Sequence, residues 1–481
     1  MQTKPKTHLL LLFLFLRLNC RELIKVIQII RHGARDYYLK NGEEKQSANA
    51  FLTNKGFWQM ENLGAQMAKK YANKLKISQY SSDEVKIVLS ARSRCEYSAK
   101  AYFHGFFGKI EGSEKLKAYK SPSSKLELLP NVEAKLNRFK MEKIGLHNNF
   151  LFRSHVPITC PNMLNFLDQK DFSQDPEITK FIDIIFAKLK KNHFDYKKIV
   201  KGLPSKIFQI KTLHDYFYST YFYHGSGKTP PIPLHLFKII RSLQIYLWYK
   251  KRRFDKKIYS SLATPLLKAI KNDITLGVND LNSSSRKKFV LYSGQDSAIY
   301  TLLNSLGFAE SDCYSKAVNK KKAVSFSRKK KCMNYPQFGD SLTFEVSLVG
   351  LSFMVSVLYN NKVILTSKIE KFLEHLSNLQ DVNFISNCFG DQTDDSRFFQ
   401  SQLTGVDLAV DEQLQIKNSK EINIMTGDEG ERNFKRKDKE DYSQFLTDIP
   451  KLLALGVVFL VIFSTFFIMK FIRGIKGVKS I

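Results

Sequence analysis

The feature that most constrains the fold is the segment 23–30, which is apolar except for Lys25 and Gln28. A strand that is apolar on both of its faces is typical of a parallel sheet covered by helices on both sides. Residues 53–71 then carry apolar side chains at helical spacing, with Thr53 as the expected N-cap of the helix, and residues 85–89 have the pattern of a second strand. The alternation of strand and helix predicts an α/β fold.

The remainder of the chain predicts a core that is interrupted by an insertion. Strand patterns return at 289–292, 342–348 and 353–365, the last broken by a turn at Asn360-Asn361. Residues 121–284 are mainly helical and aromatic-rich in pattern. We therefore expect residues 21–120 and 285–400 to form a central, mostly parallel sheet flanked by helices, with 121–284 inserted as a helical cap.

The first twenty residues have the composition of a signal peptide. Lys4 and Lys6 precede an apolar run at 9–16, which is too short to span a bilayer. A short buried helix is the alternative interpretation. We expect residues 1–20 to be removed on export.

The C-terminal region predicts a membrane anchor. Residues 452–469 carry no charge and consist mainly of Leu, Val, Ile and Phe, close to the roughly 20 residues that a spanning helix needs. We expect a charged juxtamembrane stalk over 401–448, a transmembrane helix over 450–471 and a basic cytoplasmic tail over 472–481. This order describes a single-pass type I membrane protein, with its main domain in the lumen of a lysosome or another endomembrane compartment, or outside the cell. A buried core helix is the alternative.

The charge balance favours no single partner. The chain has 76 Lys and Arg against 45 Asp and Glu, a net charge of +31. This charge suits an anionic substrate or a membrane surface, but a general drift toward Lys gives the same balance.

The six cysteines lack the spacing of a structural zinc site. We expect no nucleic-acid partner and leave a homodimer open.

Residues able to bind phosphate follow the first strand directly, as Arg31-His32-Gly33-Ala34-Arg35. Two guanidinium groups on either side of an imidazole can hold a tetrahedral dianion above a nucleophile, and the glycine allows close approach of the backbone. A basic surface cluster is the alternative reading of these five residues alone.

Two further strand ends carry reactive side chains. Arg94 follows the strand at 85–89, and Gln295 and Asp296 follow the strand at 289–292. Because ligands bind at the carboxyl ends of parallel strands, we expect these residues to converge with His32. A positioned Asp can protonate a leaving oxygen.

Together these residues resemble the histidine acid phosphatases, whose pattern is R-H-G-x-R, a later Arg and a distant S-G-H-D. The corresponding residues here are Arg31 to Arg35, Arg94, and Ser293-Gly294-Gln295-Asp296. The resemblance extends over residues 23–390 and includes Leu52-Thr53, Gly56 and Gln59 of the first helix. With the predicted leader and anchor, the chain resembles the lysosomal and prostatic, type I membrane branch.

The resemblance implies a two-step hydrolysis of phosphomonoesters without a metal or organic cofactor. His32 would form a phosphohistidine, and Asp296 would protonate the leaving group. The phosphate would be bound by Arg31, Arg35, Arg94 and Gln295. The resemblance also implies a disulfide between Cys160 and Cys388; a pair of Cys313 with Cys332 is a second expectation, and Cys95 is expected to keep its thiol.

The sequence departs from the family pattern at two places. Gln295 stands where the family has a His, so a neutral amide replaces a group that can carry charge. The hydrogen bond to phosphate is then weaker by about 1 kcal/mol, and we expect the rate to be several-fold to tenfold lower. Asp36 follows Arg35 and could draw it away from phosphate. The alternative function is therefore a weakened or inactive phosphatase-like protein that binds phosphate.

Overall fold

A computed structural model describes most of the chain up to residue 390. The described residues are 21–35, 51–110, 126, 128, 130–145, 149–153, 160, 162, 175–203, 205–224, 232–251, 256–281, 283, 286–309, 316, 320 and 335–390. They lie in the first of two units, Met1–Ser401 and Gln402–Ile481. Residues 1–20 and 401–481, with the predicted leader, stalk, anchor and tail, are outside the described part. Among the described helices, none has the length and apolar character that a membrane span requires.

Seven strands of the described chain form one sheet in the order β3-β2-β4-β1-β5-β6-β7. Their bounds are β1 (Arg21–Arg31), β2 (Val85–Ser90), β3 (Glu142–Ile144), β4 (Phe289–Gly294), β5 (Ser341–Val349), β6 (Ser352–Tyr359) and β7 (Lys362–Lys368). The first four are mutually parallel, whereas β5, β6 and β7 extend the sheet by antiparallel pairings. Only β5 and β7 of these strands run against the common direction, so the α/β fold with a mostly parallel sheet is confirmed.

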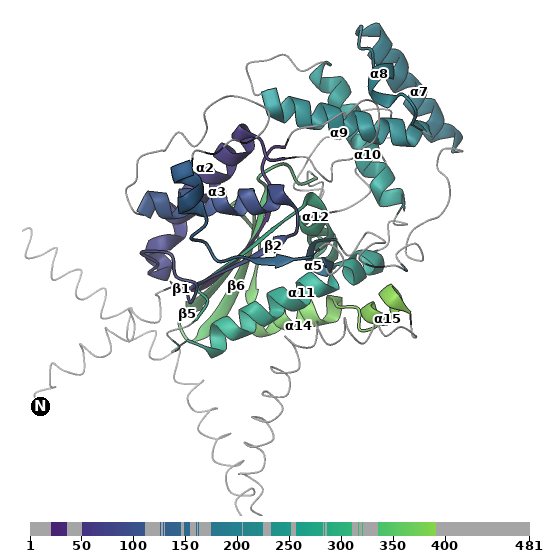
Figure 1. The fold of residues 1–481 in the computed structure, drawn as a ribbon. Helices are drawn as coiled ribbons and strands as arrows, with labels where there is room; N and C mark the ends of the chain where they lie inside the picture. Colours follow the sequence, from purple (N-terminus) through teal and green to yellow (C-terminus); the bar gives the residue numbers. More distant parts are fainter. Residues whose placement is uncertain are drawn as a thin grey trace, which may run out of the picture. The chain divides into compact units, whose positions relative to one another are not determined.

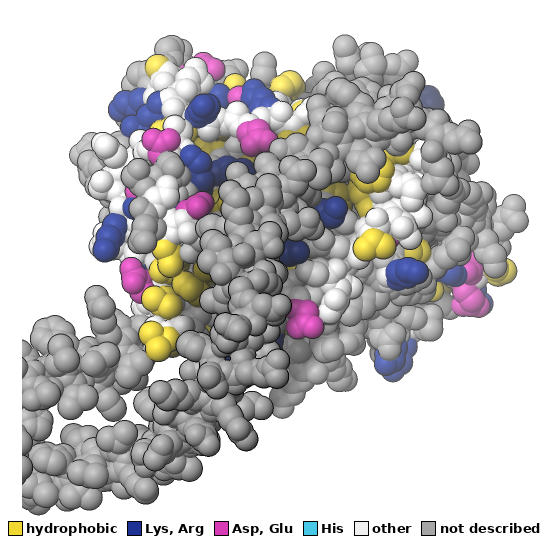
Figure 2. Space-filling model, turned by 90° about the horizontal axis from the view of Figure 1, so that it is seen from below, with side chains coloured by type: hydrophobic (Ala, Val, Ile, Leu, Met, Phe, Trp, Pro, Cys, Tyr) yellow, Lys and Arg dark blue, Asp and Glu magenta, His cyan; other side chains and the backbone are white. Residues whose placement is uncertain are grey.

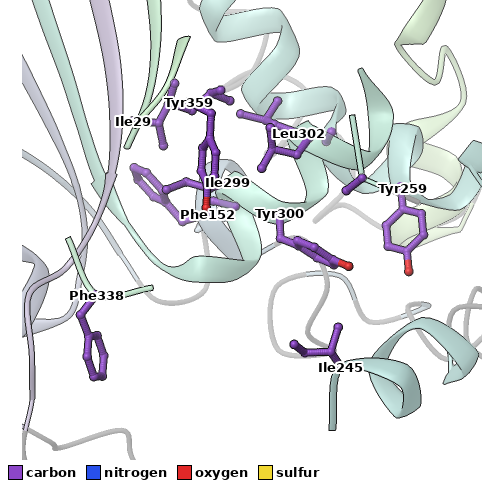
Figure 3. Close-up of a cluster of buried hydrophobic side chains, with 14 of the residues drawn as sticks. Ile29, Phe152, Ile245, Tyr259, Ile299, Tyr300, Leu302, Phe338 and Tyr359 are labelled. Carbon is purple, nitrogen blue, oxygen red and sulfur yellow. The ribbon is translucent and has the colours of Figure 1, made fainter. Parts of the chain in front are cut away.

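Helices cover both faces of β1, which explains its apolar run. On one face of the sheet, α2 (Asn54–Leu75) packs against β1 and α3 (Ser93–Ile110) against β2 and β4. On the other, α11 (Lys256–Asn279) and α12 (Asp296–Ser305) pack against β1, and α14 (Ile369–Leu379) packs against β6 and β7. Val26 and Ile30 point to the first pair of helices, and Ile27 and Ile29 to the second group. Figure 3 shows part of the apolar cluster that Ile27 and Ile29 share with α11 and α12. To this cluster α12 contributes Ile299, Tyr300 and Leu302.

Two polar residues of β1, Lys25 and Gln28, lie inside the core. Gln28 donates to Thr343 Oγ1 at 3.0 Å and accepts from the Tyr102 hydroxyl at 2.6 Å. Lys25 is 1% exposed. Burial lowers the pKa of Lys25 to about 8, and the nearby Asp273 carboxylate partly offsets that shift. The apolar pattern is therefore interrupted without leaving Gln28 unpaired.

The segment 121–284 contributes to two parts of the structure. Its remaining helices are α4 (Pro130–Leu136), α5 (Phe150–Arg153), α7 (Pro176–Lys191), α8 (Lys197–Val200), α9 (Lys206–His224) and α10 (Leu234–Lys251). The helices α7, α8, α9 and α10 lie together, away from α2 and α3 (Figure 1). In contrast, β3 adds an edge strand to the sheet and α11 packs against β1.

Local signals in the sequence correspond to turns and caps in the structure. Thr53 accepts a hydrogen bond from the Gly56 amide at 3.0 Å and caps α2. Asn360 and Asn361 have φ values of 48° and 63° and form the tight turn between β6 and β7. Both predictions are confirmed.

The expected disulfide joins Cys160 to Cys388 across 228 residues of sequence. Cys388 lies in α15 (Phe384–Phe389), so the bond ties the end of the core to the insertion. Cys95 takes part in no disulfide and contacts the Gly294 carbonyl oxygen through its sulfur at 3.6 Å. Cys313 and Cys332 lie outside the described residues.

The described surface mixes charges of both signs. On the face drawn in Figure 2, Lys and Arg side chains are interspersed with Asp and Glu and with apolar groups. This distribution on one face is consistent with a Lys-rich composition spread over the surface.

Candidate active site

The carboxyl ends of the parallel strands bring the predicted residues together. Arg31 ends β1 and is paired in register with Gly294 at the end of β4. The His32 amide donates to the Gly294 carbonyl at 3.1 Å, which carries the loop after β1 alongside Gln295. Arg94 lies in the first turn of α3, directly after β2. These connections place residues from three strand ends at one edge of the sheet.

Two glycines allow the loop after β1 to pack against α2. A Cβ on Gly33 would lie 2.4 Å from the Gly56 carbonyl oxygen, and a Cβ on Gly56 would lie 2.0 Å from the Ala34 carbonyl oxygen. Both distances are shorter than any real carbon contact, so neither position accepts a side chain without displacing backbone. The Gly33 amide also donates to Ser98 Oγ of α3 at 3.0 Å. Close packing thus fixes the backbone on which His32 is held.

Gln59 connects this loop to a second one. Its Oε1 accepts from the Ala34 amide at 3.1 Å, and its Nε2 donates to the Phe338 carbonyl at 2.5 Å. The loop that contains Phe338 precedes β5 and meets Arg31 and His32 from the other side. One side chain of α2 therefore holds two walls of the site at a fixed separation.

The hydrogen bonds of His32 define its tautomer. Its Nδ1 lies 2.9 Å from the Gly33 carbonyl oxygen, which can only accept, so Nδ1 carries the proton. Its Nε2 accepts from the Nε–H of Arg94 at 3.1 Å and therefore presents a lone pair. An imidazole in this tautomer can act as a nucleophile through Nε2.

The surroundings of His32 favour the neutral ring. Burial lowers the pKa of His32 well below its ordinary value, and the charges of Arg94, Arg31 and Arg35 lower it further, against a smaller opposing effect of the Gly33 carbonyl. His32 is 2% exposed. The lone pair on Nε2 is thus retained at acidic pH.

Arg31 is held through both of its terminal nitrogens. One terminal nitrogen donates to the Tyr218 hydroxyl at 3.0 Å and to the Pro336 carbonyl at 2.6 Å. The other lies 3.0 Å from an Asp296 carboxylate oxygen. The guanidinium also lies 4.3 Å from the centre of the Phe338 ring. This cation is therefore fixed in orientation beside His32.

Arg35 and Arg94 complete the group of three buried arginines. Arg35 pairs with Asp215 of α9 at 2.6 Å. Burial, together with the charge of Arg35, lowers the pKa of Arg94 to about 10, so Arg94 remains a cation in acid. Three guanidinium groups around one imidazole have the chemistry to bind a tetrahedral oxyanion. Asp36 lies outside the described residues.

Asp296 is the first residue of α12 and is the more accessible of the two predicted catalytic groups. Its Oδ1 accepts from the Ser297 amide at 2.9 Å, while Oδ2 pairs with Arg31. The carboxylate is 28% exposed, whereas the side chain of Arg31 is 6% exposed. Asp296 is therefore held at the wall of the site with access to solvent, as a proton donor to a leaving group would be.

Gln295 lies in a neutral network rather than against an arginine. Its Nε2 donates to Ser90 Oγ at 3.1 Å, and Asn149 Nδ2 donates to the same hydroxyl oxygen at 2.8 Å. The hydroxyl hydrogen of Ser90 can then point elsewhere, toward a bound anion for example. The amide of Gln295 is 8% exposed, so it lines the site without carrying charge.

The structure adds two functional side chains that the sequence analysis missed. Asp215 and Tyr218 lie on α9, 180 and 187 residues from the arginines that they contact. Asp215 is the single acidic residue in the aromatic-rich segment Lys206–His224, which was the only signal available in the sequence. In the described ranges, no group of three or more His, Cys, Asp or Glu side chains could hold a metal ion.

The solved structures to which the chain is similar include phytases and an inositol polyphosphate phosphatase. The phytase of Citrobacter braakii is 14% identical, with a TM-score of 0.47, and the match covers 76% of this chain and 99% of that one. The Hafnia alvei phytase in complex with tartrate is 13% identical over 76% of this chain and 98% of that one, with a TM-score of 0.46. The multiple inositol polyphosphate phosphatase of Bifidobacterium longum, in complex with inositol hexasulfate, is 13% identical over 72% and 88% of the two chains, with a TM-score of 0.46. No curated protein matches the chain.

The family is established by a match along most of the chain. The model of the histidine phosphatase superfamily, branch 2, matches residues 36–360. That segment starts directly after Arg35 and contains Arg94, Gln295 and Asp296. Because the match covers more than half of the 481 residues, the chain belongs to branch 2 of the histidine phosphatase superfamily.

Proposed function

We propose that this protein is an acid phosphatase that hydrolyses phosphomonoesters through a phosphohistidine on His32. The observation that carries the proposal is the arrangement of His32, whose Nδ1 is bound to a carbonyl and whose Nε2 presents a lone pair among three buried arginines. This arrangement combines a nucleophile with preorganised positive charge.

In the first step, the substrate phosphate binds to Arg31, Arg35 and Arg94, and the Nε–H of Arg94 turns from His32 to a phosphate oxygen. His32 Nε2 then attacks phosphorus, the bond to the ester oxygen breaks, and Asp296 gives its proton to the leaving alcohol. In the second step, Asp296 takes a proton from water, which attacks phosphorus and breaks the P–N bond. Inorganic phosphate leaves, and His32 and Asp296 return to their starting states.

The proposed acidic working range agrees with the state of His32. An imidazole that is held neutral below its ordinary pKa keeps its nucleophilic lone pair in acid.

We place the enzyme in a membrane, with the phosphatase domain in a lysosomal or other endomembrane lumen or outside the cell. The apolar run at 452–469 and the basic residues after it support this orientation. The disulfide between Cys160 and Cys388 supports an oxidising compartment.

The second candidate function is a weakened or inactive phosphatase that retains phosphate binding. Gln295 favours it, because a neutral amide bound to Ser90 cannot supply the positive charge of an imidazolium to the transition state. Binding by the three arginines would persist in such a protein.

Hydrolysis of 4-nitrophenyl phosphate by the full-length protein in detergent tests the proposal. We expect turnover at acidic pH that is lost in His32→Ala, and a base-stable, acid-labile phosphoryl label that forms only when His32 is present. Thermal unfolding of His32→Ala, compared with that of the wild type, shows that the variant is folded. Turnover unchanged in His32→Ala would contradict the proposed nucleophile, and phosphate binding without turnover in well-folded protein would favour the second candidate.

A further inference from the structure

Helix α9 directs two side chains at the phosphate-binding arginines. Asp215 and Tyr218 are three residues apart and therefore lie on one face of the helix. Asp215 pairs with Arg35 at 2.6 Å, and the Tyr218 hydroxyl accepts from Arg31 at 3.0 Å. The insertion thus supplies an anion to the binding site, in addition to Asp296 of the core.

The position of Asp215 places its charge close to bound phosphate. Its Oδ1 contacts one terminal nitrogen of Arg35, whose side chain is 7% exposed. A phosphate that binds to the same guanidinium would lie about 4 to 7 Å from this carboxylate, given hydrogen bonds of roughly 2.6 to 3.2 Å on either side. The side chain of Asp215 is 29% exposed, so part of the carboxylate is accessible to solvent.

The charge balance of the site is suited to one phosphate group. Three guanidinium groups face two carboxylates, Asp296 and Asp215, while His32 is neutral. The net charge of these six groups is one positive unit with Asp296 ionised and two when Asp296 carries the proton for the leaving group, so one phosphate dianion already balances or exceeds it. A second anionic group next to the scissile phosphate, on the side of α9, would meet the Asp215 carboxylate.

We propose that Asp215 is a specificity-determining residue that disfavours substrates with a second phosphate beside the scissile one and so selects simple phosphomonoesters with neutral or cationic leaving groups. This inference rests on the proposed function of the site. Its physical basis is like-charge repulsion, by which a site rejects a competitor through an unfavourable contact. An anion paired with Arg35 also lowers the positive charge available to any polyanion.

The closing experiment compares two substrates that differ only in neighbouring phosphates, myo-inositol monophosphate and myo-inositol hexakisphosphate. We measure kcat/KM for both with the full-length protein in detergent. We expect the wild type to prefer the monophosphate. Asp215→Asn should raise the ratio of kcat/KM for the hexakisphosphate to that for the monophosphate by about tenfold. Asp215→Glu, which keeps the charge, should retain the wild-type preference.

A matched control removes a carboxylate from the same insertion at another ion pair. Asp183 of α7 pairs with Lys206 at 2.6 Å with both side chains about half exposed, and Asp183→Asn should leave the ratio of the two substrates unchanged. An equal loss on both substrates in Asp215→Asn would show that Asp215 only orients Arg35, and no change on either would show that its charge is not sensed. Either result would overturn the inference.

Binding separates this inference from the proposed hydrolysis. The Kd values of inorganic phosphate and inositol hexakisphosphate can be measured by calorimetry whether or not turnover occurs. We expect Asp215→Asn to tighten binding of the hexakisphosphate by about tenfold relative to inorganic phosphate. Absence of turnover with this shift in Kd would contradict the proposed function and retain the role of Asp215. Turnover without any shift in Kd would retain the proposed function and contradict the role of Asp215.

Discussion

The Nε–H of Arg94 donates a hydrogen bond to Nε2 of His32 across 3.1 Å. The proposed nucleophile and one of the proposed phosphate ligands are therefore in direct contact before any substrate binds. The contact holds the imidazole plane in place, and the cation opposes protonation of the atom that has to attack phosphorus.

Replacement of Arg94 by Met should change both the rate and its dependence on pH. The loss of one preorganised donor should lower kcat/KM by about 100-fold or more. Because the cation of Arg94 lowers the pKa of His32, its removal should raise that pKa and move the acidic limb of the kcat/KM profile to higher pH. Arg92→Met, just before α3, is the control. An acidic limb that stays in place would contradict the coupling between the two side chains.

Replacement of Gln295 by His should increase activity. The imidazole can carry charge toward the transition state, whereas the amide donates to the neutral Ser90 hydroxyl. The difference of about 1 kcal/mol between charged and neutral hydrogen bonds corresponds to a gain of several-fold to tenfold in kcat. Steady-state kinetics with 4-nitrophenyl phosphate measure it. A drop in kcat would mean that the network of Gln295, Ser90 and Asn149 is itself required.

Replacement of Asp296 by Asn should affect substrates according to their leaving group. The amide cannot donate a labile proton to an alkoxide, so kcat for an alkyl phosphate should fall by about 100-fold or more, whereas 4-nitrophenolate leaves with little need of an acid. Comparison of glycerol phosphate with 4-nitrophenyl phosphate in one variant provides an internal control. Equal losses for both substrates would assign Asp296 to the orientation of Arg31 alone.

Replacement of Gly33 by Ala should destabilise the fold. The added methyl group would lie 2.4 Å from the Gly56 carbonyl oxygen, a contact that only displacement of backbone can relieve. We expect a loss of about 1 to 3 kcal/mol in the free energy of unfolding, measured with denaturant. Gly145→Ala is the matched control, because a Cβ there meets no atom within 4 Å. Equal stability of the two variants would contradict the close packing of the loop on α2.

Replacement of His214 by Phe should improve stability in acid. Burial lowers the pKa of His214 to about 3, with a further contribution from the charge of Arg241, and the buried Nε2 has no hydrogen-bond partner. In the unfolded chain the imidazole of His214 is protonated below about pH 6.5, whereas in the folded chain it is protonated only near its lowered pKa. Between these two values the free energy of unfolding therefore decreases as pH falls, by up to about 1.4 kcal/mol per pH unit. The variant keeps the ring stacking against Tyr218 and Phe237. Its advantage in thermal unfolding should grow from neutral pH to pH about 4; a constant difference would show that His214 does not titrate in this way.

The sequence was sufficient for the features that depend on neighbouring residues or on strand order. The apolar run of β1, the Thr53 cap and the Asn360-Asn361 turn are local, because periodicity and backbone preference act over a few residues. The convergence of His32 with Arg94 followed from the rule that parallel strands end at one edge. The Cys160 to Cys388 disulfide followed from family resemblance.

The sequence did not predict the contacts between the insertion and the arginines at the carboxyl ends of the strands. Nothing in the pattern of α9 indicates that Asp215 meets Arg35 or that Tyr218 meets Arg31, since these pairs are separated by 180 and 187 residues. The tautomer of His32 also depends on which groups surround it in three dimensions.

The sequence by itself determined the chemical groups available at the strand ends and the fold that gathers them. The tertiary structure alone decided which cation contacts which anion, and hence how much positive charge remains for a substrate. The reason is physical: hydrogen bonds and charge interactions depend on distances of a few Å, and such distances between remote residues are set by packing of whole elements and not by any local pattern.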